Sequence, residues 1–165
     1  MPSRARCLFK YKGKDRRGVM SGVGSVKIVG RDAGEWALAA EALLLLAGFR
    51  VALAVVPVRW ILRGIARGGA AGDGAGNERG RAIAVRVRWA VEAVARHSVV
   101  RFVCFPQTLA GYVMLRQRGV AGTMVYGVAR SGAGELIAHT WLMLGDKGVL
   151  GGEGAGAFTV VERWE

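Results

Sequence analysis

The chain has 165 residues, of which 52% are apolar and 22% charged, and this composition is typical of a globular protein and excludes a mainly disordered one. Its length suits one domain with a core rather than two. The formal net charge of +12 would suit nucleic acid, an anionic membrane or an acidic peptide, although an arginine-rich composition by itself explains it equally well.

Residues 1–31 are basic and rich in glycine, and we predict a flexible segment with at most a short strand at Val26–Val29. Met20 is an alternative to Met1 as the true start. No apolar stretch follows the basic beginning, so we expect no secretory signal and a cytoplasmic protein. Aromatic residues do not interleave with the basic ones, and no DNA-binding motif spacing occurs, so we expect no nucleic-acid partner.

Residues 32–165 are predicted to form a single domain that begins with a helix. Asp32–Glu35 has the pattern of a helix start, with an acid at the N-cap and a glutamate three residues later. The apolar stretch that follows contains Glu41 and Arg50, whose charges make a membrane span costly. We therefore expect a buried helix pair kinked at Pro57, with membrane contact as the less favoured alternative.

A glycine-rich linker is predicted at residues 68–80, and an amphipathic helix at Arg81–His97. A second helix is predicted over residues 104–118. It is apolar on nearly all sides, which indicates a central, buried position, and Gly111 would allow a neighbour to pack closely. Gly119 is expected to end it as the residue after the C-cap.

After Gly119 the pattern changes to short β-prone runs separated by glycine-rich turns, at residues 120–130, 135–144, 149–150 and 157–161. These runs predict an antiparallel meander. Helices followed by strands place the chain in the α+β class, with N-terminal helices packed on a small antiparallel sheet.

Cys104 and His139 are the residues with the clearest chemical potential. A thiol at a helix start meets free N–H groups and the positive end of the dipole, which favour a thiolate and can hold an oxyanion. His139 lies 35 residues later on a predicted strand that could bring its imidazole to that helix start. The alternatives are an ordinary core cysteine and a satisfied core histidine.

The remaining candidates are weaker. His97 ends a predicted helix, where a histidine usually caps the last carbonyls. Cys7 and Cys104 lack metal-ligand spacing, and a zinc site that used both cysteines and both histidines would match no known pattern. We expect neither a metal nor a cofactor, and free thiols suit a reducing compartment.

Several motifs in order resemble the lasso-peptide maturation B protein, a microcin-processing branch of the transglutaminase-like superfamily. The resemblance spans roughly residues 32–165. The motifs are Val103–Ala110, Leu115–Val120, Tyr126–Val128, Ala138–Trp141 and Val149–Gly152.

This resemblance implies a papain/transglutaminase-like cysteine protease that removes the leader from a ribosomally made precursor peptide, before an ATP-dependent lasso cyclase closes the ring. Many such proteins carry a leader-recognition domain in front. Residues 1–31 are too short for one, so we expect the split form, which relies on a separate leader-recognition protein. The positive charge would then serve docking to that partner or to the precursor leader peptide.

The sequence departs from this family at the third catalytic position. Members often carry an aspartate about a dozen residues after the histidine, where this chain has Gly151. If Asp146-Lys147 is a two-residue turn, Gly154 faces His139. We rank Glu153, re-aimed by a bulge, ahead of Asp146, and a backbone carbonyl or a water is a further alternative. The departure also leaves open a catalytically silent scaffold or binding subunit.

Overall fold

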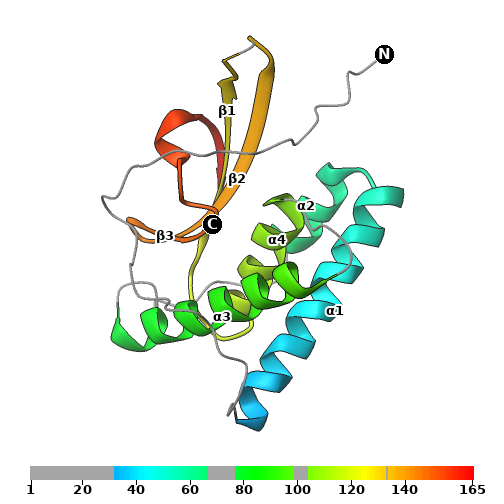
Figure 1. The fold of residues 1–165 in the computed structure, drawn as a ribbon, viewed down its shortest axis with the longest axis vertical. Helices are drawn as coiled ribbons and strands as arrows, with labels where there is room; N and C mark the ends of the chain where they lie inside the picture. The colour runs from blue at the N-terminus through cyan, green and yellow to red at the C-terminus, as the bar shows by residue number, and fades with distance from the viewer. Residues whose placement is uncertain (1–31, 67–76, 99–103, 133) are drawn as a thin grey trace.

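The structure, a computed structural model, describes residues 32–66, 77–98, 104–132 and 134–165. Figure 1 shows the helices gathered on one side and the sheet on the other. The predictions of a flexible segment at 1–31 and of most of the linker lie outside the described residues. The class is α+β, as predicted, with four helices and one antiparallel sheet in the described part.

Two consecutive helices, α1 (Ala33–Val55) and α2 (Val58–Ala66), follow the predicted N-cap, because the Asp32 side chain accepts from the Glu35 N–H at 2.9 Å. The break between them falls at Pro57, as expected. Their burial was predicted wrongly. In α1 only Leu38, Ala42 and Leu46 are buried, so this helix contacts the core along one narrow stripe.

Helix α3 (Glu78–His97) begins three residues earlier than the sequence predicted. The reason is local: the Asn77 side chain accepts from the Gly80 N–H at 2.7 Å and so caps the first turn. The end of the predicted linker is therefore helical. At the other end, His97 Nδ1 lies 2.8 Å from the Ala93 carbonyl, which is the predicted capping role.

Helix α4 (Cys104–Arg116) is the central element, packed against α1, α3 and the sheet. The absence of a side chain at Gly111 lets Leu142 and Leu150 of the sheet approach the helix, because a Cβ there would collide with Leu150. Gly119 has φ +69°, and the Val120 N–H reaches the Leu115 carbonyl at 3.0 Å. The predicted buried helix and its glycine stop are both confirmed.

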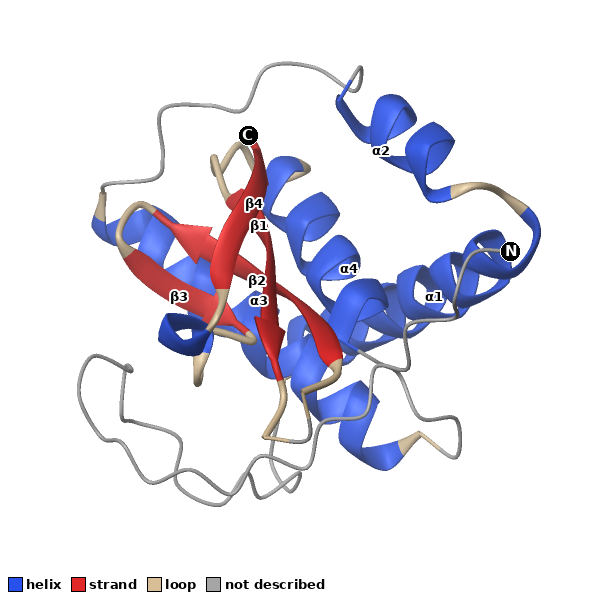
Figure 2. Cartoon of the chain, turned by 90° about the horizontal axis from the view of Figure 1, so that it is seen from above, coloured by secondary structure: helices blue, strands red, loops and turns tan. Residues whose placement is uncertain are grey.

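The sheet contains β1 (Thr123–Arg130), β2 (Leu136–Leu144), β3 (Lys147–Leu150) and β4 (Thr159–Trp164), in the order β3-β2-β1-β4. The predicted meander is wrong at its last step. A short 3-10 helix, η1 (Ala155–Ala157), carries the chain past β3, and β4 pairs with β1 at the opposite edge (Figure 2).

The register at the β2–β3 hairpin also differs from the prediction. Leu144 pairs with Lys147, so the turn residues are Gly145 and Asp146 rather than Asp146 and Lys147. Gly145 has φ +61°, a conformation that glycine adopts without strain. The register then shifts at Leu142/Met143, so the irregularity lies within the ladder and not at Gly151-Gly152.

Candidate active site

The first residue of α4 is Cys104, and the sequence explains why the helix starts there. Pro106 falls in the first turn, where its missing N–H costs no intrahelical bond. The Cys104 thiol is half-buried. It therefore combines partial access to solvent with the positive end of the helix dipole, the setting that favours a thiolate.

His139 lies in the middle of β2, beyond the stretch that β3 covers, because the β2–β3 ladder includes only Leu142, Met143 and Leu144 of β2. The Cys104 side chain hydrogen-bonds to the His139 side chain. The thiol and the imidazole that the sequence singled out are thus brought together. Their catalytic roles remain a prediction.

A main-chain carbonyl fixes the ring of His139: Nε2 donates to the Gly151 oxygen at 2.8 Å. This bond leaves Nδ1 as the nitrogen available to the sulfur of Cys104. Gly151 has φ +66°, and a Cβ there would lie 3.0 Å from the Thr140 carbonyl and 3.4 Å from His139 Nε2. Glycine is thus the residue that best permits this carbonyl to reach the ring.

The structure places the Gly151 carbonyl, the backbone alternative, on the ring of His139, and a catalytic role for Glu153 or Asp146 stays a prediction. Asp146 lies in the exposed β2–β3 turn. Glu153 is also exposed, with 76% of its side chain accessible, and its carboxylate lies 3.8 Å from Arg88 of α3. Neither carboxylate bonds to His139 Nε2, because the Gly151 carbonyl already accepts from that nitrogen.

Opposing effects act on the pKa of His139. Burial by itself would lower this pKa. The hydrogen bond with the Cys104 side chain, the bond to the Gly151 carbonyl and the charge on Cys104 all favour the imidazolium. Together they outweigh burial, and the pKa of His139 lies above its ordinary value of 6.5. The site therefore favours a thiolate–imidazolium pair.

Aromatic rings line His139. The Trp141 ring stacks at 6.0 Å between centroids with 24° between planes, and Phe158 lies at 5.2 Å. Both rings are buried themselves. They limit water around the imidazole, and their faces can interact favourably with its cationic form.

Two threonines that the sequence analysis did not single out join the two halves of the site. Thr108 Oγ1 lies 3.0 Å from the Cys104 carbonyl, 3.2 Å from the Thr140 carbonyl and 3.3 Å from Thr140 Oγ1. Within the described residues these are the two fully buried polar side chains. Thr108 lies one helical turn after Cys104, and Thr140 follows His139. The available signal in the sequence was a threonine one helical turn after Cys104 and another directly after His139.

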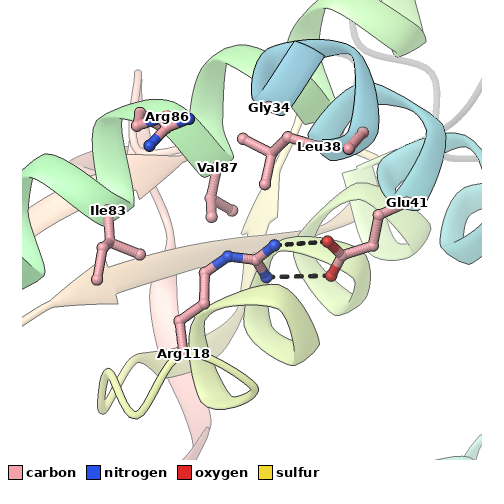
Figure 3. A pocket seen from close by; sticks show the side chains of 8 residues that line it. Gly34, Leu38, Glu41, Ile83, Arg86, Val87 and Arg118 are labelled. Atoms are coloured by element: carbon pink, nitrogen blue, oxygen red, sulfur yellow. Dashed lines mark hydrogen bonds and ion pairs between the residues drawn. The ribbon is translucent and has the colours of Figure 1, made fainter.

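A cavity of about 290 Å³ lies at the opposite end of α4, between α1 and α3. Its apolar lining includes Leu38 and Val87, and Figure 3 shows Arg118 extended to Glu41 beside them. Neither Cys104 nor His139 lines this cavity. In the described ranges no three His, Cys, Asp or Glu side chains gather in a way that could hold a metal ion.

Comparison with protein families gives one match. A model described as the transglutaminase-like superfamily matches residues 43–163, which is well over half of the chain and includes Cys104, His139 and Gly151. Comparisons with curated proteins and with solved structures gave no match.

Proposed function

Because the chain belongs to the transglutaminase-like superfamily, whose scaffold is compatible with cysteine peptidase chemistry, we propose that it is a cysteine peptidase. We propose further that it removes the leader from a ribosomally made lasso-peptide precursor before macrocyclisation. The observation that carries the proposal is the hydrogen-bonded Cys104–His139 pair, with the ring held by Gly151.

The chemistry would proceed in two steps. The Cys104 thiolate attacks the carbonyl carbon of the last leader residue, and the Cys104 N–H with a neighbouring donor holds the oxyanion. His139 gives its proton to the departing amine of the core peptide, which leaves a thioester. Water, deprotonated by His139, then hydrolyses the thioester and restores the thiolate. The Gly151 carbonyl keeps the ring oriented through both steps.

The partners belong to the proposal as well. We assign recognition of the leader to a separate small protein and ring closure to an ATP-dependent cyclase, with all of them in the cytoplasm. The net charge of +12 supports docking of an acidic peptide or an acidic partner surface. No cofactor is needed for the two steps above.

The test is to incubate precursor, recognition protein and this protein, and to follow the mass of the released core peptide. We expect release by the wild type, none by Cys104→Ala, and wild-type release by Cys7→Ser, which removes the other thiol. Iodoacetamide should block the reaction by alkylating Cys104. Cleavage that persists in Cys104→Ala would contradict the proposal. Binding of the precursor without any cleavage by the wild type would favour the silent scaffold.

A further inference from the structure

Helix α1 has a second apolar face that nothing in the described structure covers. Trp36, Leu43, Leu44, Val51 and Val55 are between 47% and 75% exposed. Their spacing places them on one side of the helix, opposite the buried stripe of Leu38, Ala42 and Leu46. We call these five residues the outer face of α1. From Trp36 to Val55 this face extends about 28 Å along the helix.

A core helix does not explain this pattern. By length and composition α1 is apolar enough to cross a membrane, yet only 17% of its most apolar window is buried inside the protein. A helix that is apolar on all sides is normally enclosed on all sides, either by protein or by lipid. Something outside the described residues must therefore cover the outer face.

The charges around this face indicate its partner. From Trp36 to Ala66 the sequence contains one acid, Glu41, which pairs with Arg118, and three arginines, Arg50, Arg59 and Arg63, all of them exposed. Exposed tryptophans lie in the first turn of each helix, Trp36 on α1 and Trp60 on α2. An apolar strip with arginines and tryptophans around it is what the interface of an anionic bilayer binds.

A second copy of the chain fits less well. In a two-fold pairing of outer faces the same surface meets itself, and Glu41, the one acid between Trp36 and Ala66, already pairs with Arg118, so this stretch has no further acid to balance its arginines. Lipid phosphates supply that balance. We therefore propose that α1 and α2 attach this protein to an anionic membrane surface.

The helix lies along such a surface and does not cross it. Leu38, Ala42 and Leu46 belong to the protein core. Glu41 on the same side is paired with Arg118 of the α4 end. Removing α1 from these contacts would expose the core, so the outer face alone enters the lipid, to the depth of the headgroup–acyl boundary.

The test is co-sedimentation of the full chain with vesicles of phosphatidylcholine, with and without phosphatidylglycerol. We expect binding to the anionic vesicles, weaker binding at high salt and little binding to the neutral ones. Quenching of tryptophan fluorescence by brominated lipid should fall in Trp36→Phe. Failure to bind anionic vesicles at low salt would overturn the proposal.

Two pairs of variants identify the surface. Leu44→Gln/Val51→Gln should weaken binding by more than about tenfold, whereas Leu136→Gln/Val161→Gln, at similarly exposed apolar positions on the sheet, should not. Equal losses in both variants would overturn the assignment. The assignment would also be overturned if the wild type did not bind vesicles and instead formed a dimer that Leu44→Gln/Val51→Gln dissociates.

The arginines have a matched control on α3. Arg50→Gln/Arg59→Gln should weaken binding to anionic vesicles by about 30-fold and reduce its salt dependence. Arg79→Gln/Arg81→Gln removes the same charge from exposed positions elsewhere and should have a clearly smaller effect. None of these assays uses a precursor, and Cys104→Ala should bind as the wild type does, so a failure of the proposed peptidase activity leaves this result interpretable.

Discussion

The two ends of helix α4 are held in place by different kinds of interaction. At the first end, Cys104 meets His139, and Thr108 ties the helix to β2 through neutral, buried hydrogen bonds. At the second end, Arg118 forms a two-pronged ion pair with Glu41 of α1. The first end contains a reactive thiol held in position by buried hydrogen bonds, whereas the second contains an ion pair that holds α1 against the end of α4. We therefore expect changes at the first end to alter chemistry and changes at the second to alter stability.

His139→Gln should give the largest effect after removal of the thiol itself. Loss of general acid–base catalysis typically costs about 10²–10⁴-fold in rate, and the amide cannot become cationic to stabilise the thiolate. The measurement is kcat for precursor cleavage, with the melting temperature as a control for folding. A variant that retains wild-type kcat would show that the pair at this end of α4 has no chemical role.

The pH dependence of stability gives a second check on the same residue. The pKa of His139 is raised above 6.5 in the folded protein, so protonation favours the folded state. Its contribution to stability is fully present below pH 6.5 and is lost as the pH rises through the folded pKa. In His139→Gln, the free energy of unfolding should no longer show this decrease as the pH rises. The same deprotonation should reduce activity at alkaline pH.

Gly151→Ala tests whether a main-chain carbonyl replaces the missing acid. The φ of +66° and the approach to the Thr140 carbonyl make a Cβ costly here, by about 1–3 kcal/mol. A shifted carbonyl would release His139, and we expect kcat to fall about 10–100-fold. Gly145→Ala is a matched control, since it has φ +61° with open space around it. It should lose stability without a comparable loss of kcat.

The local features of this site could be predicted from the sequence. Pro106 in a first helical turn and Gly119 after the last turn mark the limits of α4, and both are signals within a few residues of the chain. The Gly151 carbonyl was not predictable in the same way. It depends on the position of the β2–β3 turn and on a register shift inside the ladder, and a one-residue change in either moves every later backbone group.

Two other features depend on contacts between distant segments. The pairing of β4 with β1 requires η1 to redirect the chain, and the composition of a short β-prone run does not determine its neighbour. The burial of α1 was misjudged for a similar reason. A helix that is apolar on all sides contains no periodic signal for which side faces the core, so the pattern predicts burial of both sides.

Thr108→Val should affect positioning more than binding. The change removes a hydroxyl that bonds Thr140 but keeps the volume of the side chain, and we expect a loss of about 1–2 kcal/mol in stability. If Thr108 sets the approach of α4 to β2, kcat should fall several-fold while KM stays near the wild-type value, and Thr108→Ser should restore most of the loss. A purely structural role would lower the melting temperature and leave kcat of the folded protein unchanged.

The smallest effects on catalysis should come from the Arg118–Glu41 pair. Each side chain is 28% exposed, so water partly screens the pair, and we expect a coupling free energy of about 1 kcal/mol. The measurement is a double-mutant cycle of chemical unfolding with Arg118→Gln, Glu41→Gln and the double variant. Arg118 also donates to the Met114 carbonyl at 2.8 Å, so its single change should cost more than that of Glu41. The rate of cleavage per folded molecule should match the wild type in all three, because the pair lies at the far end of α4 from Cys104. A fall in kcat without a loss of stability would mean that the two ends are coupled through the helix and that the ion pair also positions the thiol.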